Sequence, residues 1–261
     1  MLRPRIIPCL LIHKGGLVKT TRFREPKYVG DPINAVRIFN EKEADELMVL
    51  DIDASINGED PVFKLIAKLA SECRMPLCYG GGVKTVAQTR RLVDMGVEKV
   101  AVSSSAISKP SLLKEMADAV GGQSVVAVLD IKRRQRVFSS IYEVCSHNAN
   151  KTHKDEFLSL IQIFQESGVG EIVINSVDRD GLMKGYDLEL AEKLKAIVNV
   201  PVTFLGGAGS LKDLEELVSK VGIVGAAAGS LFVFKGKYRA VLINYPTPEE
   251  KHKLCYSVQK Y

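Results

Sequence analysis

The sequence predicts an α/β fold, a (β/α)8 TIM barrel made of two (β/α)4 half-barrels. Eight short apolar runs alternate with longer amphipathic segments along the 261 residues. The runs are continuous rather than alternating, which is typical of parallel strands that are buried on both faces. A repeat also relates the two halves of the chain. Eight βα units in about 250 residues is the count of a (β/α)8 barrel. A doubly wound open sheet is the alternative, but it rarely has eight such regular units.

Each predicted strand is an apolar run followed by small or polar residues. The eight runs span residues 5–12, 46–52, 75–81, 99–105, 124–131, 171–177, 200–207 and 225–233. Between them, apolar residues recur at the spacing that makes one face of a helix apolar. These helical segments span residues 32–45, 60–73, 85–96, 109–121, 155–168, 187–198 and 210–221. We expect a single domain over residues 1–261, with half-barrels at about 1–122 and 123–261.

The internal repeat keeps a constant offset of 125 residues in three pairs of strands. The matching pairs are Glu46 and Glu171, Pro76 and Pro201, and Ser105 and Ser230. Chance similarity between apolar runs would not preserve one offset. The first and fifth strands align with an offset of 119, which places Leu11 opposite Asp130. The first half therefore has a leucine where the second half has an acid.

Composition and charge exclude several classes of function. The net charge of +5 is modest, and lysine and arginine do not gather in runs, so we expect no nucleic-acid partner. No apolar run reaches membrane-spanning length, and the N-terminal run is short, contains Pro8 and lacks a small-residue cleavage site. Five cysteines without zinc-type spacing indicate free thiols in a reducing compartment. We therefore expect a cytoplasmic protein without a membrane partner.

The histidines do not predict a metal site. His13, His147, His153 and His252 are scattered without ligand spacing. Two of them lie in the polar stretch 146–156, which we expect to be a loose surface loop. We expect no metal and no cofactor.

Small residues follow the third, fourth, seventh and eighth predicted strands. Glycines let backbone N–H groups approach an anion, and serines add hydroxyl donors. These turns meet at the C-terminal face of a barrel, where active sites lie. Two glycine turns, each paired with a serine turn one unit later, predict a ligand with a phosphate at each end. The alternative is that the glycines only form tight turns. The predicted phosphate-binding residues are Gly81, Gly82, Ser104, Ser105, Gly181, Gly206, Gly207, Gly229 and Ser230.

The segment after the first predicted strand is a long basic loop over residues 13–31. Long loops at this face are often mobile lids. We expect Lys19 to contact a phosphate from this lid. The other basic residues of the loop are equally compatible with a solvated surface: Lys14, Arg22, Arg24 and Lys27.

Several motifs together resemble one family, the cyclase subunit of imidazole glycerol phosphate synthase. They are RIIPCL, the VK of the basic loop, GDP, LDIDAS, YGGGV, EKV, VLDIKR, GEI, SVDRDG, GYD and GGAGS, and the resemblance covers residues 1–235. It implies a half-repeated (β/α)8 barrel of the histidine pathway. It also implies a heterodimer in which a glutaminase docks at the N-terminal face of the barrel. Ammonia then crosses the barrel core and attacks a bisphosphorylated ribulosyl substrate, which is cleaved and cyclised.

The resemblance implies an ammonia gate made of four charges at the N-terminal face. All four match here, each at the start of a predicted strand: Arg5, Glu46, Lys99 and Glu171. The alternative is a plain salt-bridge plug, because this face of a barrel usually serves stability.

The resemblance also implies two catalytic aspartates, a general acid and a general base, at the ends of the first and fifth strands. Asp130 occupies the position in the fifth strand, whereas Leu11 occupies the one in the first strand and cannot transfer protons. His13 lies two residues further on and is a candidate substitute acid or base. The alternative is a histidine that only ends the strand.

Two functions fit this pattern. In the first, the chain is a relative that serves surface-polysaccharide synthesis, where it passes ammonia to a separate sugar amidotransferase that amidates an acetamido sugar. In the second, it is an authentic cyclase subunit of histidine biosynthesis that tolerates Leu11. Losing one member of an acid–base pair typically costs about 10²–10⁴ in rate, which favours the first. A barrel that only binds a partner or ligand is a third, more remote alternative.

Overall fold

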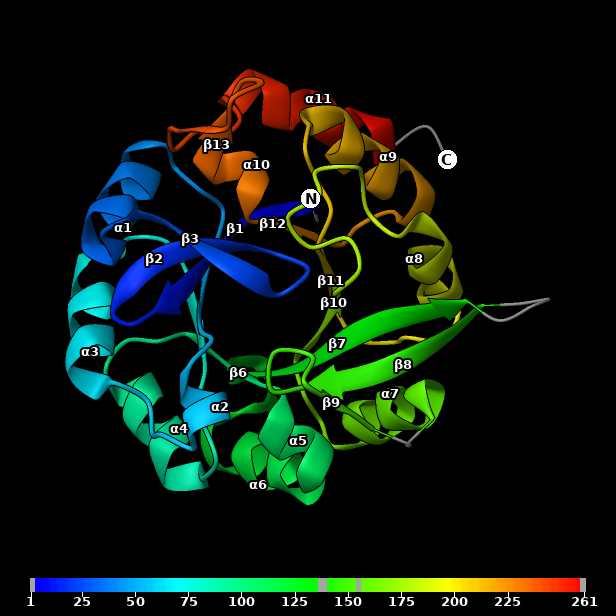
Figure 1. Cartoon of the computed structure of the whole chain (residues 1–261). Helices are drawn as coiled ribbons and strands as arrows, with labels where there is room; N and C mark the ends of the chain where they lie inside the picture. The colour runs from blue at the N-terminus through cyan, green and yellow to red at the C-terminus, as the bar shows by residue number, and fades with distance from the viewer. Residues whose placement is uncertain (1–2, 136–139, 154–155, 259–261) are drawn as a thin grey trace.

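A closed barrel of eight parallel strands forms the centre of the computed structural model, which describes residues 3–135, 140–153 and 156–258 (Figure 1). In chain order these strands are β1 (Arg5–His13), β4 (Leu47–Asp51), β5 (Leu77–Gly80), β6 (Lys99–Val102), β7 (Val125–Gln135), β10 (Glu171–Ser176), β11 (Val202–Leu205) and β12 (Gly225–Ala228). Strand β12 pairs with β1, and β7 pairs with β10, which closes the sheet. The predicted fold and its eight strands are confirmed.

The predicted helices surround the barrel (Figure 1). They are α1 (Pro32–Glu41), α3 (Phe63–Glu72), α4 (Val86–Asp94), α6 (Ser111–Val120), α7 (Phe157–Glu166), α8 (Leu188–Lys195) and α9 (Leu211–Val221). Side-chain caps fix several starts: Asp31 caps α1, and capping boxes begin α4 at Thr85 and α9 at Ser210. Three short helices follow the barrel strands β4, β6 and β12: α2 (Ala54–Asn57), α5 (Ser104–Ser108) and α10 (Ser230–Val233). A short 3₁₀ helix, η1 (Gly122–Ser124), precedes β7.

Apolar residues pack on both faces of the barrel sheet. The outer layer joins the strands to the helices and includes Phe39, Leu69, Leu92, Leu113 and Phe164, each with 0% exposure. The inner layer fills the barrel with Ile7, Cys9, Met48, Cys78, Ala101, Val126, Val128, Val173, Leu205 and Ala227. This double burial explains why the strands read as continuous apolar runs.

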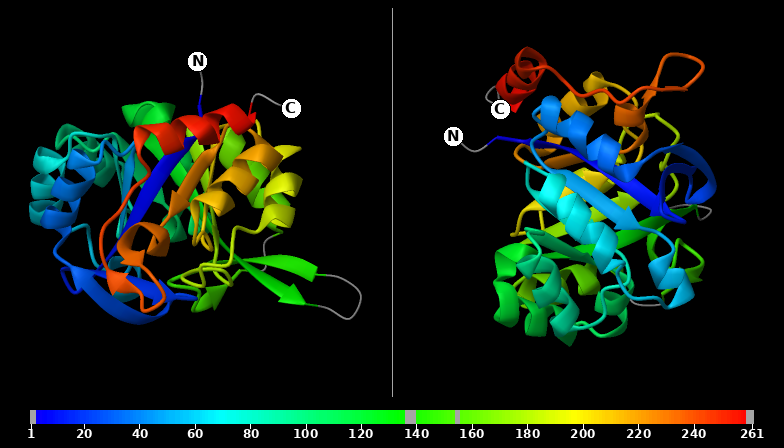
Figure 2. Two further views of the ribbon diagram at one scale, coloured as in Figure 1. Left: turned by 90° about the horizontal axis from the view of Figure 1, so that it is seen from above. Right: turned by 90° about the vertical axis from the view of Figure 1, so that its left-hand side faces the viewer.

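Three β-hairpins extend the C-terminal end of the barrel. Strands β2 (Gly16–Thr21) and β3 (Arg24–Gly30) follow β1, so the prediction of a loop over residues 13–31 is wrong for most of that segment. Strand β7 continues beyond the barrel and pairs with β8 (Ser140–Ser146), which pairs with β9 (Lys151–Thr152). Strands β13 (Phe234–Lys235) and β14 (Ala240–Val241) form the third. Figure 2 shows β2–β3 and β7–β8 at one end of the barrel and the last helix, α11 (Pro248–Val258), at the other.

The segment before α11 is fixed to the first strand. Tyr245 donates a hydrogen bond to the carbonyl of Ile6 at 2.8 Å and accepts one from the backbone N–H of Asp45 at 3.0 Å. Lys251 of α11 forms an ion pair with the Asp45 carboxylate at 3.1 Å. The C-terminal segment therefore packs against the start of the barrel.

Two further features bear on the expected class of protein. In the described part of the chain, no helix combines the length and apolar composition needed to cross a membrane. Four of the five cysteines are free thiols: Cys9, Cys73, Cys78 and Cys145. The side chain of Cys255 lies outside the described residues.

Candidate functional site

A pocket opens among the C-terminal ends of the barrel strands. Residues of seven barrel strands and the turn after β12 line it, as expected for the active face of a (β/α)8 barrel. The predicted residues of this face all line this one pocket: Lys19, Gly81, Gly82, Ser104, Ser105, Asp130, Gly181, Gly206, Gly207, Gly229 and Ser230. Leu11 lines the same pocket. Phosphate binding by these residues stays a prediction.

Two glycines that the repeat relates have the same structural role. Gly81 and Gly206 adopt φ values of +120° and +98°, in the region that favours glycine. A Cβ atom on Gly81 would lie 2.5 Å from the carbonyl oxygen of Asp51, and one on Gly206 would lie 2.7 Å from that of Ser176. Each turn thus passes directly over the end of the preceding barrel strand. Tight packing alone accounts for these two glycines, and a phosphate would be an additional role.

Lys19 is held inside the pocket by the β2–β3 hairpin. The side chain is 5% exposed and donates a hydrogen bond to the carbonyl of Cys9. Burial lowers the pKa of Lys19 below its ordinary value. Gly229 leaves room for this side chain, because a Cβ atom there would lie 2.6 Å from Nζ. The predicted lysine therefore reaches the pocket from a strand rather than from an irregular loop.

Asp130 lies on β7 in the pocket wall. Asn175 on β10 donates a hydrogen bond from Nδ2 to Asp130 Oδ1 at 2.9 Å. Burial raises the pKa of Asp130 to about 7, the Asn175 hydrogen bond opposes this rise, and the charge of Asp180 adds to it. The carboxyl group can therefore give or take a proton near neutral pH, as a general acid or base must.

The first strand contributes Cys9 and Leu11 to the pocket wall. Leu11 packs against the apolar residues inside the barrel. Burial raises the pKa of the Cys9 thiol to about 11, so the thiolate is scarce at neutral pH. Among the described residues, β1 therefore brings to the pocket no group that titrates near pH 7.

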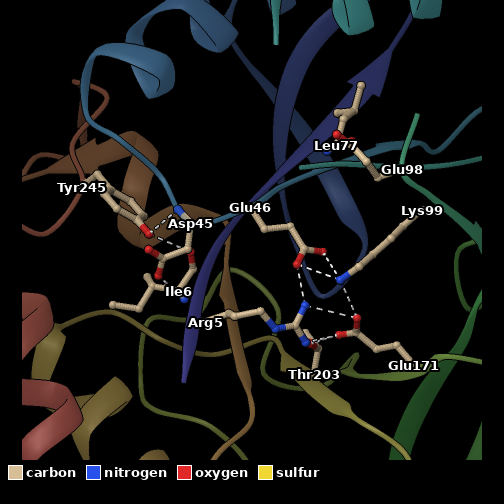
Figure 3. Close-up of polar contacts among 10 residues, drawn as sticks. All are labelled: Arg5, Ile6, Asp45, Glu46, Leu77, Glu98, Lys99, Glu171, Thr203 and Tyr245. Atoms are coloured by element: carbon tan, nitrogen blue, oxygen red, sulfur yellow. Dashed lines mark hydrogen bonds and ion pairs between the residues drawn. The ribbon is translucent and has the colours of Figure 1, made fainter. Parts of the chain in front are cut away.

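Four charged side chains form a closed ring at the opposite end of the barrel (Figure 3). Arg5 contacts Glu46 and lies 2.7 Å from Glu171, and Lys99 Nζ lies 2.8 Å from a carboxylate oxygen of each glutamate. Thr203 also donates a hydrogen bond to Glu171. The four predicted ring residues therefore meet, each at or just before the start of its strand.

The ring keeps its charges despite being largely buried. Burial alone would lower the pKa of Lys99, but the carboxylates of Glu171 and Glu46 outweigh it and raise the pKa above its ordinary value. Burial alone would raise the pKa of Glu171, but Arg5 and Lys99 hold it below its ordinary value. The charges of Lys99 and Glu171 thus depend on their partners in the ring.

Comparison with known proteins agrees with this geometry. Residues 5–239 match the family described as histidine biosynthesis protein. The chain is 55% identical to the provisionally named imidazole glycerol phosphate synthase subunit hisF3 of Vibrio vulnificus, over 97% of this chain and 96% of that protein. It is 51% identical to the provisionally named subunit hisF2 of Pseudomonas aeruginosa, over 94% and 97%. It is 37% identical to imidazole glycerol phosphate synthase subunit HisF of Alkaliphilus metalliredigens, over 89% and 91%.

The chain belongs to the cyclase subunit family of imidazole glycerol phosphate synthase.

Within this cyclase-family barrel, His13 is not among the described residues that line the pocket. Its Nδ1 lies 2.6 Å from Oδ1 of Asp53, whose other oxygen accepts the backbone N–H of Lys14 at 2.7 Å. This arrangement stabilises the end of β1. A role for His13 as a substitute acid or base stays a prediction, and it would require the side chain to turn toward the pocket.

The cyclase-family pocket also includes polar residues that the sequence did not indicate, among them Asn175, His147 and Asn148. Asn175 lies inside an apolar run, so no pattern marks it. Asn148 donates a hydrogen bond to the carbonyl of Ile52 at 3.0 Å, which ties the turn after β8 to the end of β4. The prediction of a loose loop over 146–156 is therefore wrong for this turn. Residues 154–155 lie outside the described part.

Proposed function

We propose that this chain receives ammonia from a glutaminase docked at the ring end of the barrel and delivers it to the pocket. One observation carries the proposal: the four-charge ring is complete, whereas the pocket above it lacks an acid on β1. Ring residues Arg5 and Lys99 each bridge both glutamates. The acid position holds Leu11. A role in ammonia transfer needs the ring and the barrel interior, but it does not need the second catalytic acid.

The barrel interior suits an uncharged, small molecule. The residues between the ring and the pocket are apolar, and several are small, such as Cys78, Ala101 and Ala227. Ammonia can enter such surroundings without losing a full ionic hydration shell, whereas ammonium cannot. Opening of the ring would be needed at the entrance, because its side chains contact one another.

We further propose that the ammonia serves amidation of an acetamido sugar in surface-polysaccharide synthesis, carried out by a separate amidotransferase. Leu11 supports this role, because a supplier of ammonia need not cyclise a substrate. The numbers in the names hisF3 and hisF2 of two relatives at 55% and 51% identity are also consistent with additional copies of a cyclase-type subunit.

The second candidate is the cyclase reaction itself, in which ammonia and the ribulosyl bisphosphate give imidazole glycerol phosphate and an aminoimidazole carboxamide ribotide. The retained pocket favours it, since Lys19 and both glycine turns line one wall with Asp130. An ammonia supplier has no evident need for two phosphate cradles. A phosphorylated effector could occupy them instead.

Ammonia-dependent turnover of the ribulosyl bisphosphate by the purified chain separates the two candidates. The Leu11→Asp variant provides the comparison. We expect the natural chain to be slower than Leu11→Asp by about 10²-fold or more, because one acid–base partner is missing. Efficient turnover by the natural chain would favour the cyclase. Turnover restored by Leu11→Asp would support a barrel that has lost cyclisation.

Glutaminase docking is tested separately from the chemistry. Glutamine hydrolysis by a glutaminase encoded beside this chain should rise when the chain is added, and the two proteins should co-elute as a heterodimer. If neither occurs, ammonia delivery through the barrel is wrong.

A further inference from the structure

Asn175 leaves one buried polar atom unpaired beside Asp130. The residue is 6% exposed, and its Nδ2 is used in the 2.9 Å hydrogen bond to Asp130. Its Oδ1 is buried and has no hydrogen-bond partner in the described part of the chain. An unpaired buried acceptor is destabilising, so such atoms call for an explanation. A bound molecule with an N–H or O–H donor would satisfy it.

Asn175 and Asp130 both line the pocket at the C-terminal ends of the strands. Gly206 packs beside the amide oxygen of Asn175, and a Cβ atom there would come within 3.3 Å of Oδ1. Asn175 and Asp130 are direct partners in the pairing of β10 with β7. Two residues earlier on the same strands, Val173 and Val128 belong to the apolar layer inside the barrel. The two polar side chains therefore stand directly above the barrel interior, since strand residues two apart share a face.

The chemistry of the two groups restricts the ligand. The amide oxygen of Asn175 can only accept hydrogen bonds, and the ionised Asp130 carboxylate likewise only accepts. A phosphate oxygen, which is also an acceptor, would be repelled here. A small molecule with several N–H donors fits both groups at once. In the described part of the chain, Asn175 is also the one residue that donates a hydrogen bond to the Asp130 carboxylate, so this carboxylate has acceptor capacity to spare.

We propose that Asn175 Oδ1 and the Asp130 carboxyl group form a binding site for one ammonia or ammonium at the upper end of the barrel interior. The inference rests on the proposed delivery of ammonia and adds a binding site for ammonia at the end of its path through the barrel. Ammonia takes the proton of neutral Asp130, giving ammonium beside a carboxylate. Return of that proton to Asp130 releases neutral ammonia for attack on an acceptor.

Other charged groups share the pocket and enter the test. Asp180 and the buried Lys19 face the same space, as do the thiol of Cys9 and the side chain of His147. The site must therefore be probed at Asp130 itself. The carboxyl ¹³C resonance of Asp130, assigned with the Asp130→Asn variant, reports its titration.

The test is a titration of Asp130 in ammonium chloride and in tetramethylammonium chloride at equal concentration. Both salts supply a monovalent cation, but only ammonium has N–H donors. We expect ammonium to lower the midpoint of the Asp130 titration by about one pH unit, because a bound cation favours the carboxylate. The effect should vanish in Asn175→Leu. It should persist in Ser103→Ala, a matched control whose hydroxyl is also buried and unpaired in the pocket.

Three outcomes would overturn the site: equal midpoints in the two salts, an ammonium effect that survives Asn175→Leu, or one that is lost equally in Ser103→Ala. If Asn175→Leu does not fold, Asn175→Ala replaces it with the same expectation. The test needs no glutaminase. If ammonium shifts the Asp130 titration but the chain neither binds nor stimulates a glutaminase, the site is supported and the proposed delivery is wrong. If the chain binds and stimulates a glutaminase but ammonium does not shift the titration, the delivery is supported and the site is wrong.

Discussion

Asp130 shows how the fold sets the pKa of a single carboxyl group. Burial favours the neutral acid, while the hydrogen bond from Asn175 favours the carboxylate, and the balance lies at a pKa of about 7. Lys19 shares the pocket, and burial lowers its pKa as well. Both groups carry their charge less readily than in water. A ligand that supplies the opposite charge would shift each group back toward its charged form.

The raised pKa of Asp130 predicts a pH-dependent contribution to stability. The ordinary value is about 3.9, so the folded state keeps a proton between about pH 4 and pH 7 that the unfolded state has lost. This group therefore makes the protein less stable as pH rises through that window. The Asp130→Asn substitution removes the titrating carboxyl group and should therefore remove this pH dependence of stability. The variant should gain about 2 kcal/mol over wild type between pH 5 and pH 8.

Urea unfolding at the two pH values measures this gain. Asp60→Asn is the matched control for the substitution itself, because the Asp60 side chain is 68% exposed. Parallel pH curves for Asp130→Asn and wild type would contradict the raised pKa.

At the scale of elements, the barrel strands and the hairpins differ in how far the sequence predicts them. Each barrel strand is buried on both faces, so its composition alone marks it. The β2–β3 hairpin has many exposed charged residues and turns through Arg22 and Phe23, both with positive φ near +51° and +63°. Positive φ at both central residues is typical of a tight hairpin turn, but Arg and Phe rarely adopt it, so the sequence carries no hairpin signal. Long-range contacts hold it instead, since Asp180 accepts from Thr20 at 2.7 Å and from the Phe23 N–H at 3.1 Å.

The residues of the candidate site also differ in whether the sequence predicts them. Lys19, Asp130, the glycine turns and the charged ring could be predicted because the repeat or the family motifs mark their positions. Asn175 could not, because a polar residue inside an apolar strand run has no periodic signal. The place of Asn148 depends on the turn after β8, where His147, Asn148 and Ala149 all have positive φ. Such a turn is fixed by its tertiary contacts.

Thr20→Val tests the contact that anchors the β2–β3 hairpin. The change keeps the shape of the side chain but removes the donor to Asp180. We expect a loss of about 1–2 kcal/mol in the free energy of unfolding, because a buried carboxylate loses a hydrogen bond. Amide hydrogen exchange across residues 16–30 should quicken. Thr21→Val, one residue along the same strand, should change neither by a comparable amount.

At the scale of the whole molecule, the barrel has a charged end and an end with the candidate pocket, joined by an apolar interior. The ring at the first end consists of buried charges that satisfy one another. Removing one ring residue leaves buried charges of the others without an opposite charge beside them. The resulting loss of stability depends on the complete ring rather than on any one ion pair.

Lys99→Met should therefore destabilise the protein by about 2–4 kcal/mol at neutral pH, since Glu46 and Glu171 each lose a cation. Chemical unfolding measures the loss. Lys109→Met, which breaks an exposed pair with Glu115, should cost less than about 1 kcal/mol. If the ring also gates ammonia, Lys99→Met should change the ratio of aminated product to glutamine consumed. If Lys99→Met lowers stability but does not change the ratio of aminated product to glutamine consumed, the ring only stabilises the barrel and does not gate ammonia.

The fastening of Tyr245 to the first strand has a consequence for synthesis on the ribosome. Strand β1 is made before the other barrel strands, yet its residues Arg5–Pro8 pair with β12, and Tyr245 reaches the carbonyl of Ile6 later still. Strand β1 must therefore wait for β12 and Tyr245 before its neighbours are complete. Nascent chains stalled before β12 should remain open to proteases along β1, whereas chains released past Tyr245 should resist them. Synthesis of β12 and Tyr245, rather than completion of the first half, would then be the step at which this barrel becomes a protected structure.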